Sequence, residues 1–189
     1  LPLLAQIGPN PSVVPQAVPT ELAGRPARTQ PAPTVTPASD QLARCLAQAG
    51  SEPVAAVAAA QAMLDTPGAR PSVETRVQAR LCRGLAHSEL GDLAPAEADF
   101  IAARDAAPRG EPGLRARLGA LAANAMLAQG RPGDAITLLD AAAAEAREAG
   151  NRALAGGIEL DRARTLVILA RDPEAALALA SAIQALPAE

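Results

Sequence analysis

Two cysteines and a single histidine are the side chains of this chain with the most scope for chemistry. Thiols such as Cys45 and Cys82 can form a disulfide, ligate a metal or act as nucleophiles. His87 can exchange a proton near neutral pH. Nucleophilic catalysis needs a base held by a third group, and a metal site needs several ligands. The sequence assembles no such set around His87, which we expect to be a partly buried, hydrogen-bonded residue.

The carboxylates are spread along the chain at the spacing of helix surfaces. Four of them illustrate the pattern: Asp134, Asp140, Glu145 and Glu148. General acid–base catalysis needs positioned groups with shifted pKa values, whereas this spacing is typical of faces in contact with water. The pair Gly156–Gly157 follows no predicted strand, so it does not indicate a phosphate-binding loop. We therefore expect no catalytic, cofactor-binding or metal-binding residues, and no enzyme.

The composition favours an all-α protein. The 189-residue chain is 49% hydrophobic but only 1% aromatic, so alanine and aliphatic residues must build the core around the sole aromatic, Phe100. Alanine is the best helix former. The net charge is −3, and no basic stripe or aromatic platform suits nucleic acid. No apolar run approaches the roughly 18 residues of a membrane span.

Residues 1–37 differ from the rest because they hold half of the 18 prolines. Prolines at this spacing exclude helix and central strand and predict an extended arm. Its candidate partner contacts are Ile7, Val13, Val14 and Val18. The opening LPLLAQ is either the end of a signal peptide or ordinary mature sequence. We expect two parts, a Pro-rich arm over 1–37 and a helical domain over 38–189.

Four similar stretches follow the arm, each joining a polar turn to a helix that starts near a proline, which suits a first helical turn. In the last, Asp172 is the expected N-cap. Aligned on Ala55, Ala96, Ala135 and Ala176, the stretches repeat at 41, 39 and 41 residues. This period predicts about four stacked helical hairpins, a short α-solenoid. First helices are expected near 39–49, 72–90, 112–129 and 151–170, and second helices near 53–65, 94–107, 132–149 and 173–186.

The stretch ARLCRGLAHSELGDLAPAEADFIAARDAAP, residues 79–108, resembles the tetratricopeptide repeat. The matching residues are Gly84, Gly91, Ala96, Phe100, Ala103 and Pro108. Small residues at 84 and 96 would let two helices approach, with Phe100 between them and Gly91 ending the first helix. Arg80 and Arg83 depart from the family, which prefers an aromatic residue and a leucine there. The resemblance spans roughly residues 40–187, carried by periodicity outside this unit; a generic α-hairpin array is the alternative.

The resemblance implies a concave face on the first helices that binds peptides. Candidate residues there are Gln78, Leu81, Leu85, Arg117, Asn124 and Asp161. The family's clamp for a C-terminal carboxylate uses lysine, arginine and asparagine, and this chain lacks lysine, so that function is disfavoured. In the same alignment His87 shares an inter-helix core position with Leu46, Met126 and Val167.

The two cysteines fall in neighbouring first helices of the predicted array. Because such helices run side by side, a disulfide between Cys45 and Cys82 is sterically allowed and would join the first unit to the second. Two buried free thiols are the alternative. We favour the disulfide, and with it an oxidising compartment such as the periplasm.

The last predicted helix carries no charge from Ala175 to Leu186, and neither does the stretch from Pro53 to Leu64. A helix that is apolar on every side is normally buried. Either alanine tolerates the exposure, or the arm, a second copy or a larger assembly covers these surfaces. The candidate partner contacts are Leu177, Leu179, Ile183 and Leu186.

These features favour a non-catalytic scaffold for protein–protein interaction, an accessory subunit of an exported, envelope-associated complex. The alternative is an intracellular helical-repeat module that senses a ligand or peptide. The expected partners are proteins, including a second copy of the chain. The state of the thiols separates the two readings, because free thiols favour the cytoplasm.

Overall fold

The structure is a computed structural model that describes residues 37–65, 68 and 70–186. The predicted contacts of the arm, Ile7, Val13, Val14 and Val18, lie outside these residues. The described part is helical and contains no strand. Its helices are α1 (Pro37–Ser51), α2 (Pro53–Leu64), α3 (Val73–Leu90), α4 (Leu93–Ala106), α5 (Pro112–Ala128), α6 (Pro132–Glu148), α7 (Arg152–Ile168) and α8 (Asp172–Ala185). These bounds agree with the predicted ranges to within a few residues.

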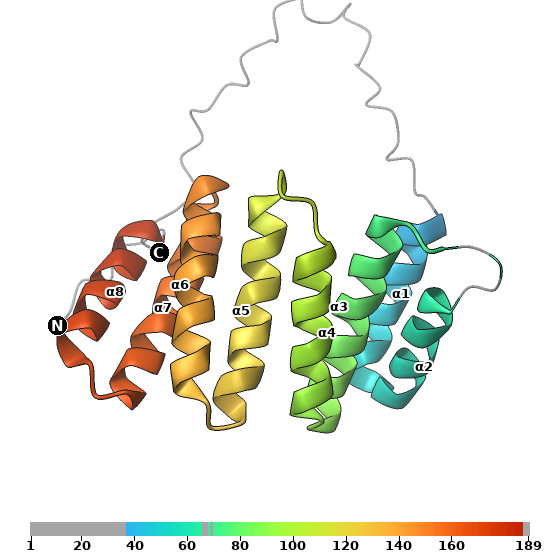
Figure 1. The fold of residues 1–189 in the computed structure, drawn as a ribbon, viewed down its shortest axis with the longest axis horizontal. Helices are drawn as coiled ribbons and strands as arrows, with labels where there is room; N and C mark the ends of the chain where they lie inside the picture. The colour runs from blue at the N-terminus through green and yellow to red at the C-terminus, as the bar shows by residue number, and fades with distance from the viewer. Residues whose placement is uncertain (1–36, 66–67, 69, 187–189) are drawn as a thin grey trace, which may run out of the picture. The chain divides into compact units, whose positions relative to one another are not determined.

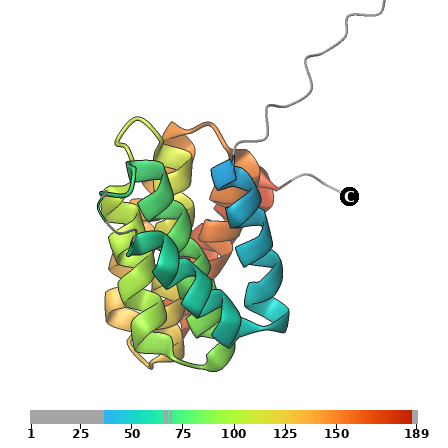
Figure 2. The same ribbon diagram turned by 90° about the vertical axis from the view of Figure 1, so that its right-hand side faces the viewer.

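The helices form four hairpins in a row. Each helix packs against the next one along the chain, and α1 also packs against α3, and α5 against α7. Figure 1 shows the helices side by side, and Figure 2 looks along the row from the α1–α2 end. The predicted all-α fold, a short α-solenoid of helical hairpins, is therefore confirmed. No helix in this part of the chain is both long and apolar enough to cross a membrane.

Left-handed residues end three of the first helices. Gly91, Gly130 and Ala170 have φ angles of 77°, 73° and 55°. Glycine adopts this conformation freely, whereas Ala170 does so with a Cβ atom. The predicted Asp172 cap is wrong, because Ala170 completes the turn and α8 already begins at Asp172. Arg171 occupies the N-cap position, and its side chain makes no capping hydrogen bond.

The predicted alignment of the four alanines is wrong in the first and last hairpins. Ala96 and Ala135 are fully buried, as expected, but in the outer hairpins the buried residues are Ala56 and Ala175. Ala55 and Ala176, the predicted equivalents, are exposed. Ala175 lies five residues after the left-handed Ala170, as Ala96 and Ala135 follow Gly91 and Gly130. In the first hairpin only Glu52 separates α1 from α2, so the spacing from the turn differs.

Phe100 lies in the core where the sequence predicts it. It is buried in a cluster with Ala96 of its own helix and Ala122 of α5. A Cβ atom on Gly84 would lie 2.6 Å from Cε1 of the Phe100 ring. Since carbon atoms do not approach this closely, α3 can lie against the ring only because residue 84 is glycine.

Candidate protein-interaction site

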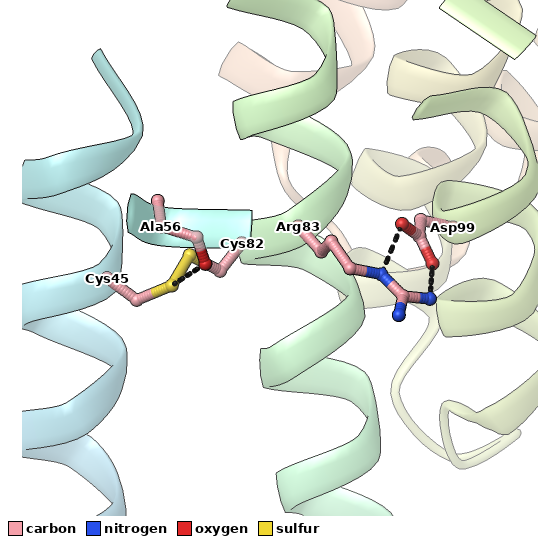
Figure 3. The surroundings of a disulfide bond; sticks show 5 residues. All are labelled: Cys45, Ala56, Cys82, Arg83 and Asp99. Atoms are coloured by element: carbon pink, nitrogen blue, oxygen red, sulfur yellow. Dashed lines mark hydrogen bonds and ion pairs between the residues drawn. A yellow bond between two sulfur atoms is a disulfide. The ribbon is translucent and has the colours of Figure 1, made fainter. Parts of the chain in front are cut away.

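Cys45 of α1 and Cys82 of α3 lie at disulfide distance, with their Cα atoms 6.0 Å apart. Both residues are buried, in a cluster with Ala49, Ala56 and Ala86. Figure 3 shows the two sulfur atoms between α1 and α3, beside the carbonyl oxygen of Ala56. A bridge here ties the first hairpin to the second, as the placement on neighbouring first helices predicts.

The other side of α3 is held by an ion pair. The Arg83 guanidinium donates to both carboxylate oxygens of Asp99 on α4, over 2.8 and 2.5 Å. This hydrogen bonding raises the pKa of Arg83. Figure 3 shows Cys82 and Arg83 leaving α3 on opposite sides. Arg83 departs from the tetratricopeptide pattern because its carbon chain reaches a carboxylate that is almost fully buried.

Two further carboxylates bridge arginines from different helices. Glu145 accepts hydrogen bonds from Arg104 and Arg115, each over 3.0 Å. Its prediction as a solvated residue is wrong, because its side chain is mostly buried between helices. Glu159 is buried and accepts from Arg147 and Arg162. Sequence reasoning missed three of these four contacts because partners 12, 30 and 41 residues apart meet only in the folded array. The fourth joins Arg162 to Glu159, three residues earlier on α7.

Burial and hydrogen bonding have opposite effects on the pKa of Arg162, one of the two arginines that bind Glu159. Burial lowers the pKa of Arg162, but hydrogen bonds to Glu159 and Asp140 outweigh it and leave that pKa raised. Asp140 remains exposed, as predicted, and accepts from Arg162 over 2.7 Å. At the end of the array, the hydrogen bond from Arg171 lowers the pKa of exposed Glu174. The Arg171–Glu174 pair lies at the surface, whereas the carboxylate of Glu159 is buried.

A groove of about 550 Å³ opens along α1, α3 and the start of α5. Its wall is mostly aliphatic, with polar groups among the apolar ones. The residues lining it are Leu42, Leu46, Val73, Glu74, Val77, Gln78, Leu81, Pro108, Glu111, Leu114 and Arg117. Because Leu46 and Val73 are exposed, the groove offers apolar surface that no described residue covers.

Two polar groups of the groove lack partners among the described residues. Gln78 donates to Glu74 over 2.9 Å, but its buried Oε1 accepts no hydrogen bond. Arg117 is exposed and takes part in none of the hydrogen bonds or ion pairs of the described chain. A free guanidinium beside aliphatic walls suits an extended peptide, which supplies a carboxylate and apolar side chains.

The groove gathers three of the six predicted concave-face residues, Gln78, Leu81 and Arg117. Leu85 packs instead against the core clusters on either side of α3. Asn124 and Asp161 are hydrogen-bonded to each other over 3.3 Å, which links α5 to α7.

Leu46, Met126 and Val167 were predicted to share the inter-helix core position of His87, and this prediction is wrong for two of them. Met126 is buried and His87 is partly buried, but Leu46 and Val167 are exposed. The reason is that each of these two lines an open hollow, Leu46 the groove and Val167 a hollow between α7 and α8. His87 Nδ1 lies 3.5 Å from Asp92 Oδ2. Among the described residues no group of three potential metal ligands exists.

The α8 residues predicted as partner contacts are exposed: Leu177, Leu179, Ile183 and Leu186. Leu186 also packs onto α7, where a Cβ atom on Gly156 would lie 2.7 Å from its Cγ. The end of α8 can therefore pack this closely against α7 only because residue 156 is glycine. The apolar surface left uncovered is the face with Leu179, Ile183 and Val167.

Comparison with family models, with curated proteins and with solved structures found no match for this chain, so its function has to be inferred from its own residues.

Proposed function

We propose that this protein is a non-catalytic scaffold for protein–protein interaction, an accessory subunit of an exported, envelope-associated complex. In this proposal the groove along α1, α3 and α5 holds an extended segment of a partner protein. The array acts as a tetratricopeptide-like support for that groove, and the resemblance of residues 79–108 to this repeat agrees with the role.

The observation that carries the proposal is the groove itself, which combines aliphatic walls with unpaired polar groups. Leu46 and Val73 offer exposed apolar surface to side chains of a ligand. Arg117 offers a guanidinium that can bind a carboxylate in a bidentate manner. Gln78 adds a side-chain amide to the wall, held to Glu74 by a hydrogen bond of 2.9 Å.

The closeness of Cys45 and Cys82 supports the exported location. Disulfides persist in oxidising compartments and are rare in the cytoplasm. A bridge between α1 and α3 also stiffens one wall of the groove, because Leu42 and Leu46 lie on α1 beside Cys45. Restricting the motion of a binding surface before its ligand arrives reduces the entropy lost on binding.

The proposal is tested by co-purification from native cells with variants of the groove. Arg117→Glu reverses the free charge, and Leu46→Glu places a carboxylate on the apolar wall. Both residues are exposed, so the variants are expected to fold. Arg44→Glu is the matched control, since Arg44 is exposed on α1, outside the groove, and has no ion pair in the described chain.

We expect the same envelope protein to co-purify with the wild type and with Arg44→Glu, and to be lost from both groove variants. Retention of that protein by Arg117→Glu and Leu46→Glu would contradict the proposed site. Absence of any specific partner from envelope fractions would contradict the scaffold role.

The second candidate is an intracellular module that senses a peptide or ligand through the same groove. The observation that favours it is the unpaired guanidinium of Arg117, which suits a small peptide as well as a partner protein. The two candidates separate by thiol state, because Cys45 and Cys82 would be reduced in the cytoplasm.

A further inference from the structure

Each hairpin of the array leaves a hollow between its two helices, and the first helix of the next hairpin fills it. Phe100 of α4 is buried in a cluster with Ala122 of α5. Leu139 of α6 is buried in a cluster with Ala155 and Ile158 of α7. In the described chain, the hollow of the last hairpin has no following helix to fill it.

The equivalent residue in that last hairpin is Leu179. Phe100, Leu139 and Leu179 each lie nine residues after a left-handed turn residue, namely Gly91, Gly130 and Ala170. Phe100 and Leu139 are at most 1% exposed, whereas Leu179 is 44% exposed. The position that forms the core of the two inner hairpins is therefore open in the last one.

The open surface is a hollow of about 360 Å³ between α7 and α8, floored by Ala163 and Ala175. Around it Val167 is 60% exposed and Ile183 is 69% exposed. No charged residue occurs from Ala175 to Leu186. A surface of this kind accepts a helix face of small and aliphatic side chains, as the inner hollows do with Ala122 of α5 and with Ala155 and Ile158 of α7.

We propose that a second copy of this chain docks on the α7–α8 face, with the two α8 helices packed against each other about a two-fold axis. The hollow is apolar, and the part of α8 from Ala175 onward is likewise uncharged, because its acidic residues Asp172 and Glu174 are confined to the first turn. In a two-fold contact the same patch serves both sides, so Leu179 and Ile183 of each copy enter the hollow of the other.

The charges at the rim of the hollow agree with this pairing. Arg164 and Asp172 both line it, and they carry opposite charges. Asp172 has no ion pair in the described chain, and Arg164 pairs only with Asp161, three residues earlier, over 3.1 Å. A two-fold axis through the hollow sets Arg164 of one copy opposite Asp172 of the other, which is complementary.

The uncharged helix α2 is the competing occupant, because Val54 at the opposite end of the array is also exposed. An α2–α8 contact uses two different patches, so it would give rings or open chains of copies instead of two-fold pairs. Closed two-fold pairs are by far the commonest oligomers. The two arrangements predict different masses in solution.

The test is sedimentation equilibrium of the full chain over a concentration series. We expect a monomer–dimer equilibrium that Leu179→Glu weakens at least about tenfold, while Val54→Glu leaves it unchanged. Arg164→Asp and Asp172→Arg should each weaken the dimer, and the double variant should restore it. Helix content measured by circular dichroism verifies that each variant folds.

Three outcomes would overturn the proposal: a monomer at every concentration, a series of growing oligomers that Val54→Glu abolishes, or a dimer indifferent to Leu179→Glu. The groove of α1, α3 and α5 plays no part in this contact. Arg117→Glu should therefore dimerise like the wild type, so failure of the dimer leaves the proposed function untouched.

Discussion

At the scale of single residues, the interior depends on a few pairs of matched shapes. The ring of Phe100 occupies the space that Gly84 leaves open, with Ala96 and Ala122 around it. These three neighbours are too small to fill a void, and the larger side chains that also pack against the cluster are the partly buried Leu81, Leu85, Ile101, Leu121 and Leu138. Most other buried side chains are alanines, so one aromatic ring supplies a large share of the local contacts.

Phe100→Ala is expected to destabilise the protein by about 3–5 kcal/mol, since a large buried side chain is removed and little can collapse into its place. Urea denaturation followed by circular dichroism measures the change. Ile183→Ala is the control, because that side chain is mostly exposed and its loss should cost little in the monomer. A negligible effect of Phe100→Ala would contradict the packing against Gly84.

The ion pair between Arg83 and Asp99 makes a prediction of a different kind. Asp99 is almost fully buried, so Arg83→Ala leaves its carboxylate without a partner and is expected to cost about 3–5 kcal/mol. The double variant Arg83→Leu with Asp99→Leu removes both charges and should recover most of that loss. Equal stability of the single and double variants, measured in urea, would show that the buried charge is not the cause.

At the scale of helices, α3 is linked on one side to the first hairpin and on the other side to α4, its partner in the second hairpin. The cysteine pair joins it to α1, and Arg83 joins it to α4 (Figure 3). Helix α1 packs mainly against α2 and α3. Its position therefore depends strongly on the link through Cys45 and Cys82.

We expect Cys45 and Cys82 to be joined in the native protein, with a contribution to stability of about 2–4 kcal/mol. Alkylation without reductant followed by mass analysis tests the bond. Two alkylated thiols would contradict both the bridge and the exported location. The stability is tested by reduction, which should increase hydrogen exchange in α1 while leaving α5 and α6 protected.

At the scale of the whole molecule, the Pro-rich segment and the helical array are expected to have separate tasks. The helices begin at Pro37, and the clusters that form their cores lie within the array. The 36 residues before it contain Ile7, Val13, Val14 and Val18, the candidate contacts for a partner.

Deletion of residues 1–36 is expected to leave helix content and melting temperature nearly unchanged while abolishing assembly with the partner complex. Circular dichroism and co-purification from native cells measure the two effects. A truncated protein that still assembles would make the segment a passive leader. One that unfolds would make it a cover for the array.

The sequence by itself determined the class of fold and the helix bounds, because their causes are local. Prolines such as Pro132 mark helix starts, Gly91 and Gly130 mark ends, and alanine favours helix throughout. The match of Gly84 to Phe100 was also predictable, since both lie in the stretch that resembles a known repeat. Closeness of the two cysteines followed from the repeat period.

Only the tertiary structure decided which faces are closed and which remain open. Ala55 and Ala56 are both alanine, so composition cannot tell which one faces the core, and a shift of one residue turns a helix by about 100°. Arg104 meets Glu145 across 41 residues. Leu179 and Leu139 are alike in type and place in the repeat, yet among the described residues only Leu139 is covered by a following helix. Burial depends on neighbours that are distant in the sequence, and the type of a residue does not reveal which neighbours it will have.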